Sequence, residues 1–501
     1  MAPPATGERT WNDLLLAQWR GADRPAVVTA EFTWSGDELL ARGGGAADWL
    51  AACGFAPGDR VPALLDESPT ALALCVGSAL SGRALAPLGT KLQPAELAVA
   101  AKDLTDVGLV TTPELVGVAA EVARLAGVPL HVLDGPPSPG PLPEVACNPD
   151  DVAFVVHTSG TTGAPKPVAV RHRALVARIE LYHRVMGIGP GDRYCSASPF
   201  HHTAGVSMVF TVLGCGAAVI PQAWFSIDGW REAGKLGVTH ALLVPTMIDL
   251  LLAEGALADA HPRVLQYGAA PIDLQTLADA LAALPGTQFL QIFGQTELSP
   301  VTALSPDDHL LGLGARPELL ATVGRAPDGV ELRLENVDDD GIGELTVNAA
   351  HAFVTDADGW RRTGDLGRID ADGYVSLHGR VNDRIVRGGE NIYPVEVERA
   401  LASLDGIREV AVVGVPDRRW GEVVKAVIVP TDPAAPPSID AVQAHCRERL
   451  AHFKVPAVVE FTAELPRNAS GKVLRRVLVA TALDGSRDDD GPVTPSAEEQ
   501  T

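Results

Sequence analysis

A nine-residue loop rich in hydroxyl groups and glycine carries the clearest chemical signal in the sequence. It follows an apolar run at 151–156 and consists of Thr158, Ser159, Gly160, Thr161, Thr162, Gly163, Ala164, Pro165 and Lys166. Glycines expose backbone N–H groups, hydroxyls donate hydrogen bonds to phosphate oxygens, and a lysine adds positive charge. The G-x-x-x-x-G-K-[ST] spacing of a Walker loop is absent. The loop therefore predicts phosphate binding of another kind, with an ordinary polar surface loop as the alternative.

The same loop, TSGTTGAPK, resembles the signature loop of the adenylate-forming superfamily, which comprises acyl- and aryl-CoA synthetases, adenylation domains of peptide synthetases, and luciferases. Further segments similar to the superfamily's motifs occur in the expected order over nearly the whole chain. The sequence is thus identified as a member of this superfamily, in the acyl/aryl-CoA synthetase branch. The resemblance implies that residues 158–163 and Lys166 bind the phosphates of ATP.

The segment FGQTE at 293–297 resembles the family's Y-G-x-T-E motif, with Phe in place of Tyr. Phe293 offers an aromatic face to adenine, and the resemblance assigns Gly294 to both the nucleotide and the acyl pockets. Thr296 can donate to phosphate, and the Glu297 carboxylate suits Mg²⁺, which usually takes one or two carboxylates together with phosphate oxygens. Without these neighbours, Phe293 would be interpreted as a core aromatic residue.

Two more segments resemble motifs that surround the nucleotide. Gly268, Ala269 and Ala270 belong to GAAP, whose backbone borders adenine and ribose in the family. Asp365 of the segment TGD would accept hydrogen bonds from both ribose hydroxyls, and Arg380 would contact the nucleotide. Each of these short segments is weak alone, since a single Asp after Gly is most often a turn residue.

The segment PRNASGK at 466–472 matches the C-terminal P-[RK]-x-x-x-G-K loop of the family. The resemblance makes Lys472 a catalytic residue together with Thr296 and Glu297. A cation 4 Å from a developing negative charge contributes about 4 kcal/mol at an effective dielectric near 20. We expect Lys472 to act mainly in the transition state of adenylate formation.

The segment from Gly379 to Pro394 resembles the hinge and the thiol-binding segment of the family. Asn382 occupies the pivot position, where most relatives have Asp or Lys. Gly388 and Gly389, which lack side chains, would let the pantetheine arm of coenzyme A pass close to the backbone. The resemblance therefore implies a small domain that rotates between the two half-reactions.

The segment PFHHTAG at 199–205 aligns with the family's P-L-F-H-x-x-G motif and predicts part of the acyl pocket. His201, His202 and Val206 are the expected lining residues, with Gly294. Peptide-synthetase domains have an Asp in this region that pairs with an α-ammonium group. Because no Asp occupies that place here, an α-amino acid is not expected. The apolar residues that follow, Val206, Met208, Val209 and Phe210, fit an apolar pocket and equally a buried helix, and on the first interpretation we expect a hydrophobic aromatic, alicyclic or fatty acid.

These segments together predict an ATP-dependent ligase that forms an acyl-AMP from a carboxylic acid and passes the acyl group to coenzyme A. ATP, Mg²⁺ and coenzyme A are the expected cofactors. A stand-alone ligase that loads a carrier protein shares every motif and remains the alternative. A luciferase-like oxygenase and a non-catalytic adenylate-binding sensor are more remote alternatives.

Composition limits the partners. The 501 residues carry a formal charge of −23, which disfavours nucleic acid and anionic lipid. Six scattered cysteines without a C-x-x-C pair indicate a reducing compartment, and no signal peptide is evident, so we expect a cytoplasmic protein. The uncharged stretch at 203–220 is interpreted as a buried helix at 206–213 and a strand at 217–220, not a membrane span. A homodimer is left open.

Alternating strand-like and helical patterns predict an α/β fold. We expect an N-terminal ATP- and acid-binding domain at 1–380, which consists of several α/β subdomains, with a strand at 264–267 before Gly268, and a small β subdomain with strands at 330–335, 343–347 and 373–377. A mobile α+β domain is expected at 381–483, with the hinge near 382, and its valine-rich runs at 410–415 and 423–430 are expected to pair as strands. Residues 484–501 are acidic and nearly free of large apolar side chains, so a disordered tail is expected there.

Overall fold

The computed structural model describes residues 8–90, 92–158, 166–196, 198–467 and 473–479. The chain divides into two compact units. The first comprises Met1–Arg333, Thr346–Thr363 and Ile369–Ser376, and the second comprises Leu334–Leu345, Gly364–Arg368 and Leu377–Thr501. Mixed α/β architecture with a separate C-terminal region confirms the predicted fold class. The exact domain limits drawn from the sequence, 1–380 and 381–483, stay predictions, and the tail at 484–501 lies outside the described residues.

An eight-stranded sheet forms the centre of the first unit. Its order is β14-β13-β12-β11-β9-β10-β1-β2, with antiparallel edge strands β2 and β14 and parallel pairing between. In chain order the strands are β1 (Pro25–Val28), β2 (Thr33–Ser35), β9 (Arg193–Ser196), β10 (Ala218–Pro221), β11 (His240–Leu243), β12 (Val264–Gly268), β13 (Gln288–Gln295) and β14 (Leu298–Leu304).

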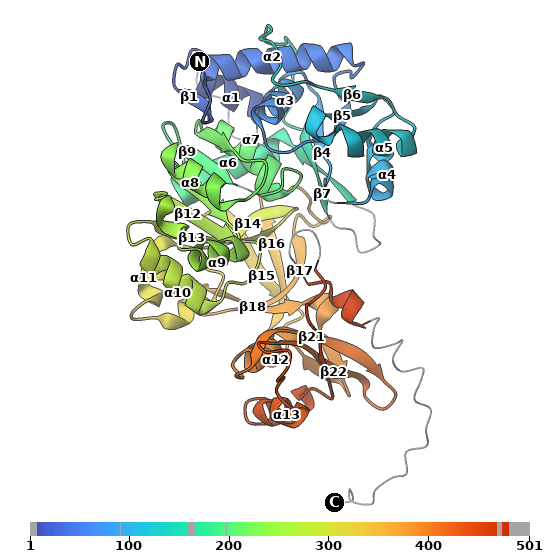
Figure 1. Cartoon of the computed structure of the whole chain (residues 1–501), viewed down its shortest axis with the longest axis vertical. Coiled ribbons are helices and arrows are strands. Elements are labelled where there is room, and N and C mark those ends of the chain that lie inside the picture. Colours follow the sequence, from blue (N-terminus) through green and yellow to red (C-terminus); the bar gives the residue numbers. More distant parts are fainter. Residues whose placement is uncertain (1–7, 91, 159–165, 197, 468–472, 480–501) are drawn as a thin grey trace, which may run out of the picture. The chain divides into compact units, whose positions relative to one another are not determined.

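Helices cover both faces of this sheet, because its parallel strands are apolar on both sides. Along β12, Val264 belongs to one hydrophobic cluster while Leu265 and Tyr267 belong to another. The Val264 face packs with α1 (Trp11–Trp19), α6 (His172–Met186) and α7 (Met208–Gly214). The other face packs with α8 (Ile227–Lys235), α9 (Pro245–Ala253) and α10 (Leu274–Ala283), which lie beside β12 and β13 in Figure 1. Helix α11 (Pro306–Gly312) follows β14.

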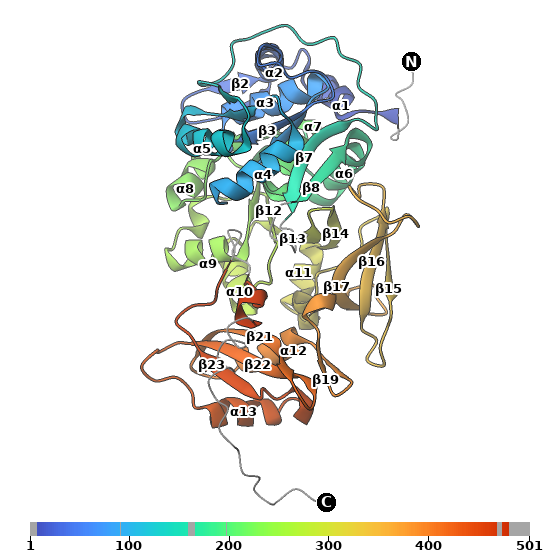
Figure 2. The same cartoon turned by 90° about the vertical axis from the view of Figure 1, so that its right-hand side faces the viewer.

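A six-stranded sheet, also in the first unit, has the order β6-β5-β3-β4-β7-β8. Its strands are β3 (Arg60–Leu64), β4 (Ala84–Pro87), β5 (Leu109–Thr111), β6 (Leu130–Val132), β7 (Val152–Thr158) and β8 (Lys166–Arg171). The accompanying helices are α2 (Gly36–Ala52), α3 (Pro69–Leu80), α4 (Pro94–Leu104) and α5 (Val116–Ala126). Strands β7 and β8 form an antiparallel pair that leads into α6, as Figure 2 shows.

A four-stranded sheet follows, with the order β15-β16-β17-β18. It is built from β15 (Val330–Glu335), β16 (Gly343–Ala349), β17 (Arg361–Ile369) and β18 (Val375–Arg380). The sequence predicted the first two strands and the start of the last. It did not predict β17, whose TGD segment was considered a turn in isolation. Gly364 keeps a φ of +72° within this strand, so the local residue type argued against a strand that the neighbouring strands stabilise.

The second unit contains a five-stranded sheet with the order β20-β19-β22-β21, and β23 pairs with β22. Its elements are β19 (Ile385–Arg387), β20 (Glu390–Ile392), α12 (Pro394–Ala402), β21 (Ile407–Asp417), β22 (Gly421–Pro430), α13 (Ile439–Arg447) and β23 (Val458–Phe461). The antiparallel pairing of β21 with β22 confirms the pair expected from the valine-rich runs.

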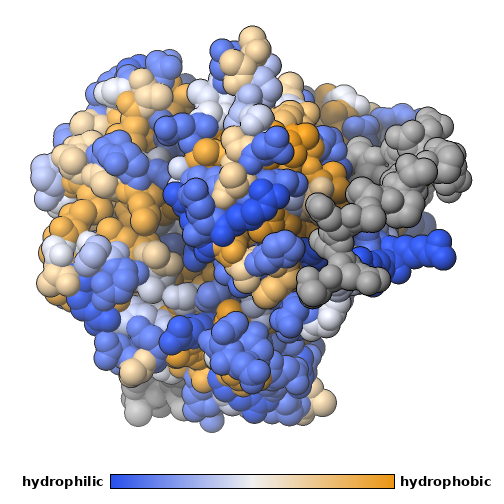
Figure 3. All heavy atoms as spheres, turned by 90° about the horizontal axis from the view of Figure 1, so that it is seen from below, coloured by the Kyte–Doolittle hydropathy of each residue, from blue (hydrophilic) through white to orange (hydrophobic). Residues whose placement is uncertain are grey.

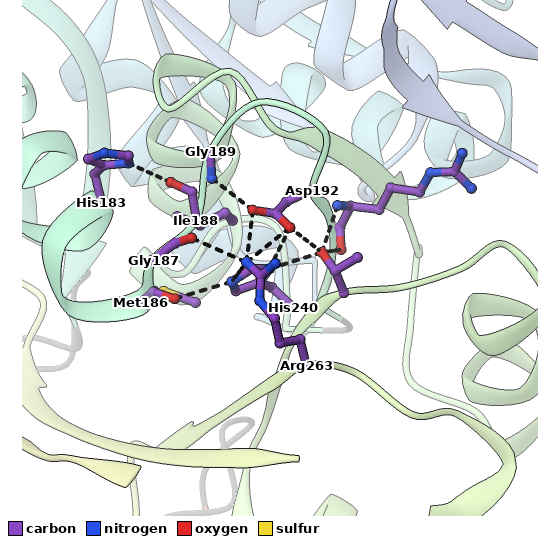
Figure 4. Close-up of polar contacts among 10 residues, drawn as sticks. His183, Met186, Gly187, Ile188, Gly189, Asp192, His240 and Arg263 are labelled. Atoms are coloured by element: carbon purple, nitrogen blue, oxygen red, sulfur yellow. Dashed lines mark hydrogen bonds and ion pairs between the residues drawn. The ribbon is translucent and has the colours of Figure 1, made fainter. Parts of the chain in front are cut away.

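A polar network built around the buried side chains of Asp192 and His240 lies at the amino ends of β9, β11 and β12 (Figure 4). Asp192 accepts hydrogen bonds from the Gly189 N–H at 3.0 Å, from the Thr239 hydroxyl at 3.1 Å and from Arg263 Nη2 at 3.1 Å. The side chain of His240 is fully buried, with Nε2 3.2 Å from the carbonyl oxygen of Met186 and Nδ1 2.9 Å from the Thr239 hydroxyl. The network therefore ties the end of α6 to three strands.

The surface mixes polar and apolar residues, as the face in Figure 3 shows. Exposed large apolar side chains include Trp224 and Leu310. No helix among the described residues is long and apolar enough to cross a membrane. The uncharged stretch at 203–220 instead forms a π-helix at Thr203–Ser207, then α7 and β10. The expected helix at 206–213 thus begins earlier, and its first turn is wider than an α-helix.

Candidate active site

The phosphate loop is anchored by a β-hairpin. Thr158 ends β7 and Lys166 begins β8, and the two residues face each other in the antiparallel register. Lys166 is exposed at the exit of the loop. The predicted phosphate-binding residues Ser159, Gly160, Thr161, Thr162 and Gly163 lie outside the described residues. The hairpin nevertheless fixes both ends of the loop at one edge of the six-stranded sheet.

The segments predicted to border adenine lie next to each other at the carboxyl ends of β12 and β13. Gly268 pairs with Ile292, immediately before Phe293. A Cβ atom on Gly268 would lie 2.2 Å from the carbonyl oxygen of Ile292, so only glycine allows this close approach. Ala269 has a φ of +66°, a left-handed conformation that is strained for a residue with a side chain. In open parallel sheets, ligands bind outside the carboxyl ends of the strands, and this location agrees with the prediction.

Gly294 continues this edge by a second close approach. A Cβ atom there would lie 2.8 Å from the Cβ of Ser299 and 2.9 Å from the carbonyl oxygen of Leu298. The narrow turn between β13 and β14 places Thr296 and Glu297 side by side. The N–H of Phe353 donates to the carbonyl oxygen of Glu297 at 2.8 Å and holds this turn.

The carboxylate of Glu297 pairs with an arginine that sequence reasoning missed. Arg361 Nη2 lies 3.5 Å from Glu297 Oε1, and both side chains are mostly buried. No cluster of three or more metal-ligating side chains occurs among the described residues. A single carboxylate fits Mg²⁺ only when phosphate oxygens complete the coordination. Glu297 fits that arrangement, provided that it shares its oxygens between the cation and Arg361.

Asp365 and Arg380 form an ion pair on the neighbouring strands β17 and β18. Arg380 Nε donates to Asp365 Oδ1 at 3.0 Å. The Asp365 side chain is 10% exposed and that of Arg380 is 56% exposed. The guanidinium therefore orients the carboxylate. The structure brings together these two predicted residues.

The predicted acyl-pocket residues lie at the π-helix. His201 and His202 are half-buried, with ring centroids 4.2 Å apart. Val206 is fully buried and packs in the central hydrophobic cluster with Met208 and Val209. A Cβ atom on Gly205 would lie 2.4 Å from the carbonyl oxygen of Pro199, which explains this glycine by packing. Single π-turns occur frequently at functional sites.

The two glycines predicted to line the thiol tunnel form the turn between β19 and β20. Gly388 has a φ of +60° and Gly389 a φ of +96°. Positive φ at both central residues is the requirement of a two-residue type I′ hairpin turn, so this turn alone explains why both residues are glycine. Asn382, the expected pivot, is exposed within a 3₁₀ turn at Val381–Asp383. Lys472 lies outside the described residues.

A second arginine, Arg178 on α6, was also missed. It is 1% exposed, and its Nη1 donates to the carbonyl oxygen of Ser299 at 2.5 Å, two residues beyond Glu297. Its Nε donates to the Thr211 hydroxyl at 3.2 Å. Arg178 thereby fixes the start of β14. The only signal in the sequence was an arginine at a helix position where the surrounding pattern predicts an apolar residue.

Comparisons with known proteins agree with this geometry. The chain matches the AMP-binding enzyme family over residues 17–353 and the C-terminal domain of AMP-binding enzymes over residues 396–472. It is 38% identical over 355 residues to the 3-[(3aS,4S,7aS)-7a-methyl-1,5-dioxo-octahydro-1H-inden-4-yl]propanoyl:CoA ligase of Rhodococcus jostii RHA1, which is 66% of either chain. It is 34% identical over 461 residues to a feruloyl-CoA synthase of an Amycolatopsis species, covering 87% of this chain and 92% of that one.

A solved structure is similarly close. ATP-bound MatB from Rhodopseudomonas palustris superimposes with a TM-score of 0.83 at 29% identity, covering 96% of this chain and all of that one. The family models and the CoA ligase relatives together show an adenylate-forming enzyme. The chain belongs to the AMP-binding enzyme family, which confirms the superfamily predicted from the sequence motifs.

Proposed function

We propose that the protein is an AMP-forming ligase that joins a largely apolar carboxylic acid to coenzyme A. Acyl-CoA ligation as the class of reaction is confirmed by the family and by the relatives named as CoA ligases. The observation that supports the finer proposal is the pairing of Gly268 with Ile292, which brings the segments 268–270 and 293–294 to the same edge of the sheet. The segment 199–206, which we propose binds the acid, has two half-buried histidines and a buried valine, and it contains no aspartate that would select amino acids.

The residues divide the first half-reaction among themselves. The loop at 158–163 and Lys166 hold the phosphates, and Phe293 with Gly268–Ala270 bounds the adenine. Asp365, oriented by Arg380, accepts from the ribose hydroxyls. Glu297 and Thr296 would hold Mg²⁺ and phosphate, and the cation, when bound, supplies positive charge to the leaving pyrophosphate. Lys472 stabilises the charge that develops as the carboxylate attacks the α-phosphorus, so positioning and electrostatics provide the catalysis.

The second half-reaction replaces AMP by the thiol of coenzyme A at the acyl carbon. We infer that the part of the chain that follows Asn382 reorients about this residue, so that Gly388 and Gly389 face the adenylate in place of Lys472. A carrier protein as acceptor is not favoured over coenzyme A. The cytoplasmic location, a homodimer and the Mg²⁺ requirement stay predictions.

Two assays test the proposal in sequence. Acid-dependent exchange of labelled pyrophosphate into ATP, measured over a panel of carboxylic acids, should give signal only when an acid is adenylated. AMP formation should then require coenzyme A for turnover with the acids that respond. Exchange without coenzyme A-dependent turnover would favour a carrier protein. Nucleotide binding without exchange for any acid would favour a sensor.

A further inference from the structure

A buried glutamine, Gln266, lies on β12 two residues before Gly268. Side chains alternate along a strand, so Gln266 shares the face of Val264 rather than that of Leu265 and Tyr267. This face packs against α6 and α7. Gln266 is only 5% exposed.

The neighbours of Gln266 across the sheet are apolar. Leu242 on β11 and Leu290 on β13 are its partners in the parallel register, and both belong to the central hydrophobic cluster. The side-chain oxygen Oε1 is buried and has no hydrogen-bond partner among the described residues. Buried polar side chains nearly always have a partner, and each exception requires an explanation. A ligand that supplies the missing donor is the explanation that this location favours.

The same hydrophobic cluster contains the π-helix of the predicted acyl segment. Val206 and Met208 belong to it together with Leu242, Val264 and Leu290. Within the part of the chain that the structure describes, the hydroxyls of Ser207 and Thr203 on this π-helix are also buried without a partner. Polar groups without a partner among the described residues therefore occur on two elements that contribute to the same hydrophobic cluster.

The position of Gln266 relative to the segment at 268–270 indicates where a ligand's hydrogen-bond donor would lie. Two residues of a strand span about 6.6 Å, so Gln266 lies one step deeper than the strand end at Gly268. A group bound there belongs to the body of the acid and not to its carboxylate.

We propose that Gln266 Oε1 accepts a hydrogen bond from a hydroxyl or N–H group on the otherwise apolar body of the acid. The enzyme therefore selects hydroxylated acids over unsubstituted acids of the same skeleton. This inference rests on the proposed function, because it names the substrate class of the same site. A site built to bind a hydroxyl discriminates strongly against the analogue that lacks it, since its own polar group is then left unpaired.

Matched pairs of acids test the inference: 4-hydroxycinnamate with cinnamate, 4-hydroxybenzoate with benzoate, and a hydroxyoctanoate with octanoate. The wild type should prefer the hydroxylated member of at least one pair by about 100-fold in kcat/KM. Gln266→Met keeps the length of the side chain and removes the acceptor, so this ratio should fall at least tenfold. Gln266→Asn, which withdraws the acceptor by one carbon, should give an intermediate ratio.

Gln291 on β13 provides the matched control. Its Oε1 is also buried without a partner among the described residues. It points to the opposite face, because Leu290 and Ile292 share the cluster of Val264 while Phe289 belongs to the other cluster. Gln291→Met should keep the wild-type ratio.

The outcomes separate this inference from the function on which it rests. Equal kcat/KM for both members of every pair in the wild type overturns the inference and leaves acid–CoA ligation intact. A ratio that survives Gln266→Met also overturns it, and so does an equal fall in Gln291→Met. Absence of pyrophosphate exchange with every acid overturns both proposals.

Discussion

Buried polar groups at the two ends of strands β9, β11 and β12 differ in whether they have hydrogen-bond partners. At the amino ends, Asp192, His240 and Arg263 form a network in which both Asp192 oxygens and both His240 ring nitrogens have partners. Toward the carboxyl ends, Gln266 Oε1 has none, and Arg361 Nε beside Glu297 is likewise buried without one among the described residues.

This difference in hydrogen bonding distinguishes a region with a structural role from a region where we expect a functional role. A hydrogen-bonded buried network holds elements together, whereas a buried polar group without a partner costs about 1–3 kcal/mol. Such a cost persists where a ligand later supplies the partner, and local rules are broken mainly at functional sites. Mutations at the two ends should therefore have different consequences: loss of stability at the amino ends and loss of catalysis or selectivity at the carboxyl ends.

The largest effect should come from Lys472→Ala. Removal of one preorganised cation should slow adenylate formation by about 10²–10³-fold, measured as pyrophosphate exchange. The thioester step should be spared when preformed acyl-adenylate is supplied. Lys235→Ala, at an exposed lysine of α8 paired with Glu232, is the control. Equal losses in both half-reactions would contradict a lysine that serves only one of them.

Asp192→Ala should break the amino-end network. Three hydrogen bonds are lost at a side chain that is 11% exposed, so we expect the free energy of unfolding to fall by about 2–3 kcal/mol. Urea unfolding followed by tryptophan fluorescence measures this loss. The KM for ATP should stay unchanged at a temperature where the variant is folded. A selective rise in this KM would show that the two ends are coupled.

A pH titration tests how the buried side chain of His172 affects the free energy of unfolding. Burial lowers its pKa to about 4, and its Nδ1 accepts the N–H of Trp11 at 3.2 Å. The unfolded state, with a pKa near 6.5, takes up the proton first, so stability is complete above about pH 6.5 and falls as the pH drops toward 4. At pH 5 the loss should be about 2 kcal/mol.

His172→Asn keeps an acceptor in place of Nδ1 and removes the titration. The difference in unfolding free energy between wild type and variant, measured by urea unfolding at pH 7.5 and pH 5, isolates His172 from the other titrating groups. The two pH profiles should diverge only below pH 6.5. Parallel profiles would mean that the ring is protonated in the folded protein.

The smallest effect should come from Gly389→Ala. An L-residue at a φ of +96° costs about 1 kcal/mol, and no atom lies near enough to clash. Gly359→Ala carries similar strain at a φ of +81°, also without a near neighbour. If coenzyme A passes Gly389, only the Gly389 variant should slow the thioester step, with adenylation unchanged. Equal rates in both variants would leave the glycine as a turn residue alone.

The features that could be predicted from the sequence are those that depend on residues close together in the chain. The strand before Gly268, the β21–β22 pair and the order of the motifs follow from residue types and spacing. Gln266 could not be singled out, because its partners Leu242 and Leu290 come from strands that are distant in sequence and interleaved in the sheet. The role of Arg361 could not be predicted for the same reason, because its ion pair with Glu297 joins segments that are 64 residues apart. The π-helix was missed because its apolar sequence also fits an α-helix.

The division of the chain has a practical consequence for anyone who wishes to handle the second unit alone. The chain passes between the units at 333/334, 345/346, 363/364, 368/369 and 376/377. A recombinant fragment that begins at residue 381 would lack 334–345 and 364–368, including Asp338, which accepts from the Tyr393 hydroxyl at 2.5 Å, and Asp365. The second unit is therefore not one continuous stretch of the chain. A domain exchange with a relative should transfer these two segments as well.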